Sequence, residues 1–360
     1  MDSAEKRLQG LSLLAIISLA FVSMSLILED KSQEPIIIYV DSASDESLSQ
    51  TQQNANNTNQ SAPPAPDQRQ YDRTEVARIA TFNIQIFGKT KIGKPEVVNE
   101  LIEIFERYDM VVVQEIKDID EQVGPQFLEA LNYGSSNMTN SNNSTSSNSS
   151  ETNESNSSNL GGDEWLMTIS PRSGIQDDDS SSAEQYAFYY RRSVFRQLGS
   201  SSLYDDSSND SFQREPFTGR FELLSKDGSS SGSDFVLVTI HATPELAVDE
   251  MHALGDVADW SVERHSDNDI IILGDFNADC SYASYNELIT LSIRAHPFTW
   301  LVPDNADTTV GDSRCAYDRI VVSSDVDGRL NGNWGIDEEI SNKSVSDHRP
   351  VWFDLIRVDD

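Results

Sequence analysis

The sequence is poor in cysteine, histidine and basic residues. Its 360 residues include 2 cysteines and 5 histidines, and 26 Lys and Arg stand against 60 Asp and Glu, a net charge of -34. The two cysteines could be free thiols, form one disulfide or supply half of a metal site. With no close His/Cys ligand pair and no His-Glu-x-x-His motif, zinc is disfavoured. So acidic a surface repels polyanions, which disfavours a nucleic-acid partner unless divalent cations or a high-salt host screen the charge.

Long uncharged apolar runs are also scarce, and one lies near the N-terminus. Lys6 and Arg7 precede an apolar run from Leu11 to Leu28, a pattern typical of a signal peptide or signal anchor. Residues 11–28 come close to the length that spans a bilayer, and no clean cleavage site follows them. A secreted protein and a membrane-anchored one are therefore equal alternatives. Both place the rest of the chain outside the cytoplasm, where a disulfide is favoured.

Low-complexity segments indicate where the predicted domain begins and where it is interrupted. Residues 41–72 are rich in Ser, Gln, Asn, Ala and Pro, which is typical of a flexible tether. Residues 134–162 are almost entirely Ser and Asn, so they cannot build a core and are predicted to form a surface loop. We therefore predict a signal peptide or membrane anchor over residues 1–30, a disordered linker over 31–74 and a catalytic domain over 75–360.

Strand-like and helix-like segments alternate within this domain. Apolar runs predict strands at Ala77–Phe82, Met110–Gln114, Trp165–Ile169, Tyr186–Arg191, Gly219–Leu224, Phe235–Ile240, Ile270–Leu273, Arg319–Val322 and Val351–Leu355. Helical periodicity predicts helices at Pro95–Arg107, Glu121–Leu131 and Pro244–His265. Many strands with few long helices indicate an α/β class in which two sheets pack face to face and helices lie outside.

Polar side chains stand at or next to the ends of several predicted strands. The residues in question are Asn83, Glu115, His241, Asp275, Asn277, Asp318, Asp347 and His348. Any one of them alone is more often a turn former than a functional group. Together they offer oxygen ligands of the kind that Mg²⁺ prefers and two histidines suited to proton transfer near neutral pH. One imidazole would activate water and the other would hold or protonate a phosphate oxygen, so the pattern predicts metal-dependent hydrolysis.

The motifs that carry these residues resemble the deoxyribonuclease I family of the endonuclease/exonuclease/phosphatase superfamily. The matching stretches follow the family order and include Ile79–Lys91, Val113–Glu115, Phe212–Pro216, His241–Pro244, Gly274–Tyr282, Trp300–Thr309, Cys315–Val322 and Ser346–His348. The resemblance runs from about Val76 to Leu355. It implies a four-layer α/β sandwich, with two mainly antiparallel sheets flanked by helices. It also implies endonucleolytic hydrolysis of DNA to 5′-phosphate and 3′-hydroxyl ends.

The resemblance further implies a role for each site residue. His241 would pair with Glu184 and His348 with Asp318 for acid/base work. The metal and phosphate residues would be Glu115, Asp275, Asn277, Asp347 and Asn83, and the substrate contacts Arg214, Lys117 and Tyr282. The cofactors would be Mg²⁺ (or Mn²⁺) and Ca²⁺. Structural calcium would fall at Asp206, Asp210, the backbone of Phe212 and Glu215, with a second set at Asp307 and Thr309. Cys280 and Cys315 would form the structural disulfide.

The sequence departs from the family pattern at two substrate positions. Ser182 stands where the family has a stacking tyrosine, and Lys117 stands where it often has an arginine. We therefore expect weaker binding of duplex DNA and an altered sequence bias of cleavage. DNA is the predicted partner of a monomer, and no protein partner is predicted. The alternatives are another phosphoesterase of the superfamily, such as a sphingomyelinase or a phosphatase, and a catalytically weak surface-binding module.

Overall fold

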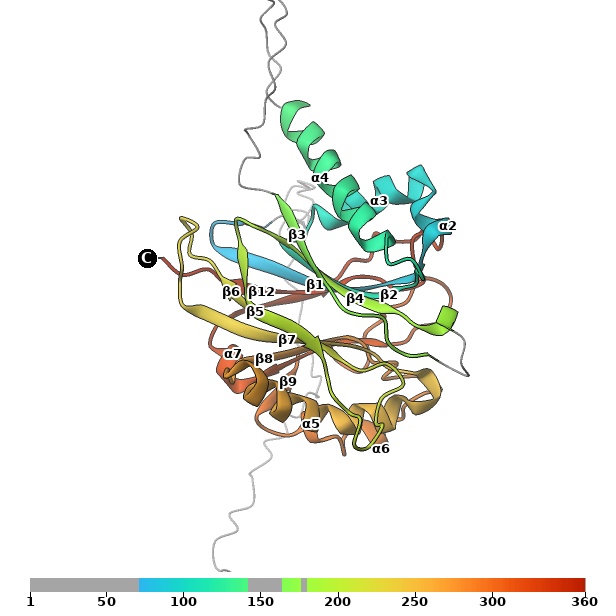
Figure 1. The fold of residues 1–360 in the computed structure, drawn as a ribbon. Helices are drawn as coiled ribbons and strands as arrows, with labels where there is room; N and C mark the ends of the chain where they lie inside the picture. The colour runs from blue at the N-terminus through green and yellow to red at the C-terminus, as the bar shows by residue number, and fades with distance from the viewer. Residues whose placement is uncertain (1–70, 142–163, 176–179, 360) are drawn as a thin grey trace, which may run out of the picture. The chain divides into compact units, whose positions relative to one another are not determined.

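Two six-stranded mixed sheets form the centre of the domain. The computed structural model describes residues 71–141, 164–175 and 180–359. The strand orders are β11-β12-β1-β2-β4-β3 in the first sheet and β5-β6-β7-β8-β10-β9 in the second. Helices α2 to α4 cover the outer face of the first sheet and α5 to α7 that of the second (Figure 1). The predicted α/β sandwich is therefore confirmed.

The first sheet contains one parallel pair, β1 with β2, and its other pairs are antiparallel. Its strands are β1 (Val76–Phe87), β2 (Met110–Ile116), β3 (Trp165–Ile169), β4 (Gln185–Arg191), β11 (Leu330–Ile336) and β12 (Val351–Ile356). The helices of this half are α2 (Lys89–Ile92), α3 (Pro95–Phe105) and α4 (Val123–Ser141).

The second sheet repeats this arrangement, with β7 and β8 as its parallel pair. Its strands are β5 (Phe195–Leu203), β6 (Phe217–Leu223), β7 (Ser233–His241), β8 (Ile270–Asp275), β9 (Phe298–Trp300) and β10 (Asp318–Ser323). The helices of this half are α5 (Ala247–His265), α6 (Tyr285–Leu288) and α7 (Ser324–Asp327). Short 3-10 turns occur at Ser180–Ser182, Pro244–Leu246 and Ser292–Arg294.

Side chains alternate between the two faces of each strand, and this alternation explains how the hydrophobic layers form. In β1, Ile79 belongs to the central hydrophobic cluster between the sheets, whereas Ala80 and Phe82 belong to the cluster beneath the helices of the first half. In β8, Ile271 and Leu273 point to the centre and Ile272 to the cluster under α5. Strands buried on both faces are apolar throughout, and this is why they could be predicted as uninterrupted runs.

Three strands and one helix end differ from the sequence prediction, and the short helices α2, α6 and α7 were not predicted. β5 and β11 are rich in Ser, Gly or Asn and partly exposed, and β9 has only three residues, so none carries a recognisable apolar run. α4 continues to Ser141, so the predicted loop over 134–162 is wrong for its first eight residues. Once a helix is nucleated, each added residue gains a hydrogen bond, which favours continuation beyond the apolar segment.

Several predictions lie outside the described residues, namely the signal or anchor over 1–30, nearly all of the linker over 31–74 and most of the Ser/Asn-rich segment. Within the described ranges, no helix is long and apolar enough to cross a membrane.

Candidate active site

Strand ends from both sheets meet at one rim of the sandwich. Asn83 and Glu115 lie near the ends of the parallel neighbours β1 and β2. His241 and Asp275 are register partners at the ends of β7 and β8, and Asp318 of β10 pairs with Asp275 from the other side. Because parallel strands end at the same edge of a sheet, residues far apart in sequence become neighbours here.

Two histidine–carboxylate pairs face a single carboxylate. His241 Nδ1 lies 2.7 Å from Glu184 Oε2, and His348 Nδ1 lies 2.8 Å from Asp318 Oδ2. The Nε2 atoms of the two imidazoles lie 3.6 and 3.5 Å from the same oxygen, Asp275 Oδ2. Each imidazole is thus oriented by its own carboxylate and presents its second nitrogen to a shared centre, as acid/base catalysis requires.

The charges in these pairs shift the pKa values. Burial raises the pKa of Glu184, but the cations around it, led by His241, outweigh this and lower it to about 2. Burial lowers the pKa of His348, but neighbouring carboxylates, led by Asp318, raise it to about 10. The pKa of His241 is also raised, because Glu184 outweighs the effect of burial. Both imidazoles therefore hold a proton more tightly than a free histidine does.

Asp275 is held by a tight backbone turn. Its Oδ2 accepts a hydrogen bond from Asn83 Nδ2 at 3.0 Å, and its Oδ1 accepts one from the Asn277 amide at 3.0 Å. Asn277 has φ of +48° and donates through Nδ2 to the carbonyl of Ala242 at 2.8 Å. Gly274, with φ of +146°, comes so close to β7 that a Cβ would lie 2.1 Å from a backbone oxygen. Only glycine permits this approach.

Glu115 occupies a strained position beside the paired histidines. Its φ is +65°, and its Oε1 accepts a hydrogen bond from the Ile86 amide at 3.0 Å. Lys117 Nζ lies 3.2 Å from Glu184 Oε1 and 4.0 Å from Glu115 Oε1. Positive φ in residues other than glycine is uncommon and concentrates at functional sites.

Some supporting residues were not predicted from the sequence. Gln85 Nε2 donates to Asp347 Oδ2 at 2.7 Å, and Ser346 Oγ donates to the carbonyl of Asn83 at 2.6 Å. Lys91 Nζ donates to the backbone carbonyl two residues before Asp347 at 2.7 Å. Together these contacts fasten the segment that carries Asp347 to the end of β1. The alternation of the strand, which places Gln85 on the same side as Asn83, was the available signal.

The predicted substrate residue Arg214 lies behind the first pair rather than at the surface. It is 6% exposed, its Nε donates to the carbonyl of His241 at 3.0 Å, and its Nη1 lies 3.6 Å from Glu184 Oε1. Its Nη2 is buried without a hydrogen-bond partner in the described structure. A guanidinium with an unpartnered donor beside the His241–Glu184 pair is suited to a phosphate oxygen.

A disulfide and a row of aromatic rings border the second pair. Cys280 and Cys315 are bonded, with Cα atoms 5.8 Å apart. The ring of Tyr282 lies 5.7 Å from that of Tyr317, which lies 6.1 Å from the imidazole of His348. Sequence reasoning singled out Tyr282, which is 36% exposed, but missed Tyr317, which lies between it and the histidine.

The two predicted calcium sets differ in how far their oxygens are satisfied. In the first, Asp206 Oδ2 accepts the Phe212 amide at 3.0 Å, while Glu215 Oε2 is buried with no hydrogen-bond partner among the described residues. Asp210, Phe212 and Glu215 line one groove of about 540 Å³. In the second, the carboxylate of Asp307 is already bonded to the hydroxyl of Thr309 at 2.9 Å and to an arginine, Arg349, at 3.1 Å. The first set is therefore the better cation cradle.

The described residues contain one group with metal-ligand spacing. Ligand atoms of Asp275, Asp318 and His348 lie within 4.8 Å of one another. This group shares only Asp275 with the metal residues predicted from the sequence. In addition, Asn83 Oδ1 is buried and lacks a hydrogen-bond partner in the described part of the chain, while its Nδ2 is engaged by Asp275. An orphaned amide oxygen on β1, whose register partner Gln114 precedes Glu115 on β2, fits a hard divalent cation.

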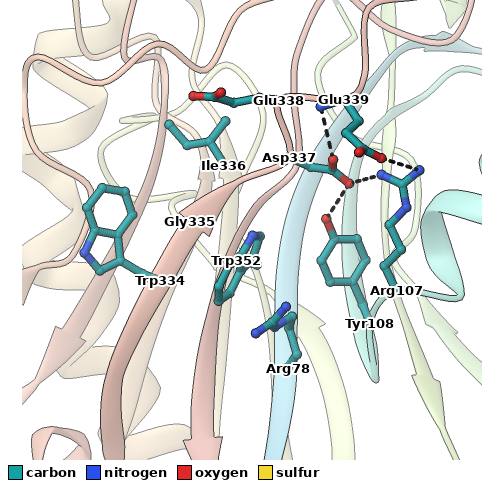
Figure 2. A pocket seen from close by; sticks show the side chains of 10 residues that line it. All are labelled: Arg78, Arg107, Tyr108, Trp334, Gly335, Ile336, Asp337, Glu338, Glu339 and Trp352. Atoms are coloured by element: carbon teal, nitrogen blue, oxygen red, sulfur yellow. Dashed lines mark hydrogen bonds and ion pairs between the residues drawn. The ribbon is translucent and has the colours of Figure 1, made fainter. Parts of the chain in front are cut away.

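A groove beside β1, β11 and β12 of the first sheet is not part of this site. It measures about 560 Å³ and is lined in part by Arg78, Trp334 and Trp352 (Figure 2). Tyr108 donates to Asp337 Oδ2 at 3.1 Å across it. Arg78 lies five residues before Asn83 on β1, and the lining of the groove shares no residue with the two histidine–carboxylate pairs.

Comparisons with known proteins agree with this geometry. The Endonuclease/Exonuclease/phosphatase family matches residues 80–348. Deoxyribonuclease-1-like 2 of Mus musculus is 35% identical and covers 68% of this chain and 76% of its own, and Deoxyribonuclease-1 of Homo sapiens is 32% identical, covering 76% and 90%. The structure of D. rerio TDP2 complexed with single strand DNA product shares the fold, with 13% identity, a TM-score of 0.50 and coverage of 78% and 98%. The chain belongs to the deoxyribonuclease I family of the endonuclease/exonuclease/phosphatase superfamily.

Proposed function

We propose that this protein is a metal-dependent endonuclease that hydrolyses DNA phosphodiester bonds to 5′-phosphate and 3′-hydroxyl ends. The observation that carries the proposal is the convergence of His241 and His348, each oriented by a carboxylate, on Asp275 Oδ2. DNA is proposed as the substrate because relatives named deoxyribonuclease match two thirds or more of the chain.

The residues present divide the chemistry between them. One imidazole takes a proton from the attacking water and the other supplies a proton at the leaving 3′ oxygen, while Glu184 and Asp318 hold both rings in the working orientation. The Arg214 guanidinium and the Asn277 amide group would hold non-bridging phosphate oxygens. We assign Lys117 and Tyr282, the predicted substrate contacts, to the DNA that flanks the scissile phosphate.

A divalent cation, Mg²⁺ or Mn²⁺, would be held by Glu115 and the free oxygen of Asn83, with Asp275 and Asp347 nearby. When bound, such an ion stabilises negative charge that develops on the phosphate. We assign Ca²⁺ a structural role at Asp206, Asp210, Phe212 and Glu215, because Glu215 Oε2 lacks a partner in the described residues. The set at Asp307 and Thr309 is less favourable, because an arginine already neutralises it.

A substrate panel tests the proposal. Supercoiled plasmid, sphingomyelin and a phosphomonoester are each incubated with the protein in Mg²⁺, in Mn²⁺ and in EDTA, and cut ends are labelled with and without phosphatase. We expect nicking of plasmid only, lost in EDTA, with 5′ ends that accept label only after phosphatase. Hydrolysis of sphingomyelin or of the monoester in preference to DNA would favour another phosphoesterase, and no turnover of any substrate would favour a binding module.

A further inference from the structure

Two isoleucines are exposed beside the active site. Ile86 is 59% exposed at the end of β1, and Ile119 is 58% exposed in the turn after β2. Both line one pocket of about 300 Å³. Exposed apolar residues are unremarkable singly, but two that share a pocket next to catalytic residues call for an explanation.

The backbone of Ile86 is strained. Its φ is +50°, in the left-handed region that β-branched residues avoid. The strain is coupled to the site, because the Ile86 amide donates to Glu115 Oε1 at 3.0 Å. Asparagine or glycine would adopt this conformation at less cost, so isoleucine occupies this position against its conformational preference.

The pocket between the two isoleucines is lined with cations. Lys117, whose Nζ bridges Glu184 and Glu115, lies in its wall together with Lys89 and Arg172. Asp118 is the one acidic residue among the described residues of this wall, and it lies 3.8 Å from Lys89 Nζ, which also pairs with Asp120. Basic residues therefore outnumber acidic ones in the wall of the pocket, whereas acids outnumber bases by 60 to 26 in the whole chain. An apolar pair inside a basic rim matches a nucleic acid strand, which presents base and sugar edges between phosphates.

We propose that Ile86 and Ile119 form an apolar wedge that enters between base steps of duplex DNA next to the scissile phosphate and sets the site preference of cleavage. This rests on the proposed function. Apolar side chains inserted between base steps unstack them, and the cost is lowest at pyrimidine–purine steps, which open most readily. Cleavage should then favour DNA positions flanked by such steps, without any hydrogen bond to a base.

Asparagine substitutions test the wedge, because asparagine tolerates the left-handed backbone at position 86. The variants are Ile86→Asn, Ile119→Asn and the double variant. Ile356→Asn is the matched control, since Ile356 is 41% exposed and pairs with Val76 at the other end of β1. Three readouts are compared: plasmid nicking, a sequenced map of cut sites, and hydrolysis of thymidine 5′-p-nitrophenyl phosphate, which has no base step to enter.

We expect the double variant to lose about tenfold in kcat/KM on plasmid, about 1.4 kcal/mol, and to lose the pyrimidine–purine preference. Its rate on the small diester should equal that of the wild type, as should every readout of Ile356→Asn. Ile86→Asn should also melt about 2–4 °C higher, because strain is relieved while DNA cleavage falls. A double variant with the wild-type cut-site map and plasmid rate would overturn the wedge alone. A wild-type protein that does not nick DNA would overturn both the wedge and the proposed function.

Discussion

The charge on Glu184 should stabilise the fold as well as orient His241. Glu184 is 1% exposed and lies among His241, Lys117 and Arg214, which lower its pKa from 4.5 to about 2. Each pKa unit corresponds to about 1.4 kcal/mol, so at neutral pH the interactions that depress this pKa contribute about 3 kcal/mol to folding. A depressed acid pKa gives stability that is present above the unfolded pKa and is lost as the pH falls towards 2.

Glu184→Gln keeps the shape but removes the charge. We expect the free energy of unfolding to fall by about 3 kcal/mol at pH 7, because two cations and a raised-pKa histidine lose their counter-charge. Nicking should fall by roughly 10²–10⁴-fold, because the His241 imidazole is no longer oriented and stabilised by a carboxylate.

The assay is urea unfolding at pH 7 alongside plasmid nicking. Asp318→Asn is the matched variant at the second pair, where Asp318 Oδ2 lies 2.8 Å from His348 Nδ1. It should be as inactive as Glu184→Gln, because each carboxylate orients one imidazole. The reasoning fails if Glu184→Gln is as stable as the wild type, or if it retains more than a tenth of the nicking rate.

Three further predictions concern the frame around the site. Burial lowers the pKa of His265 to about 4, so its contribution to stability should be complete above about pH 6.5 and decline below it, by up to about 3 kcal/mol. Urea unfolding at pH 7 and pH 4.5 should show this loss in the wild type and a smaller one in His265→Gln. Gly274→Ala should lower the free energy of unfolding by about 3 kcal/mol or more, because the new Cβ would lie 2.1 Å from a backbone oxygen. Gly228→Ala, where the Cβ meets no described atom within 4 Å, should lower it by about 1 kcal/mol. Calcium should raise the melting temperature of the wild type and of Asp307→Asn but not of Glu215→Gln, and an equal rise in all three would refute the assignment.

Much of the fold was predictable because the central strands are buried on both faces. The apolar run at Ile271–Leu273 can be recognised without alignment, whereas β11, with Asn and Gly at exposed positions, carries no such signal. The strand ends that supply the site were equally visible, since a polar residue directly after an apolar run is easily recognised. Only the register of β7, β8 and β10 brings His241, Asp275 and Asp318 together.

The supporting residues were harder to predict for a physical reason. Gln85 and Tyr317 act through contacts with residues far along the chain, Asp347 in one case and His348 in the other. The left-handed backbone at Ile86 is likewise invisible in the sequence, because isoleucine ordinarily favours extended strand. Such positions depend on tertiary contacts, which composition and periodicity do not encode.

The central claim is that the two histidine–carboxylate pairs form one DNA-cleaving centre. Its most direct test is the rate of supercoiled plasmid nicking in Mg²⁺ and Ca²⁺ by the wild type, His241→Ala, His348→Ala and the double variant. We predict that each single variant is slower by roughly 10²–10⁴-fold and that the double variant is about as slow as the worse single one, because residues that act as a unit are not additive. A wild-type rate no higher than that of the double variant would contradict the claim.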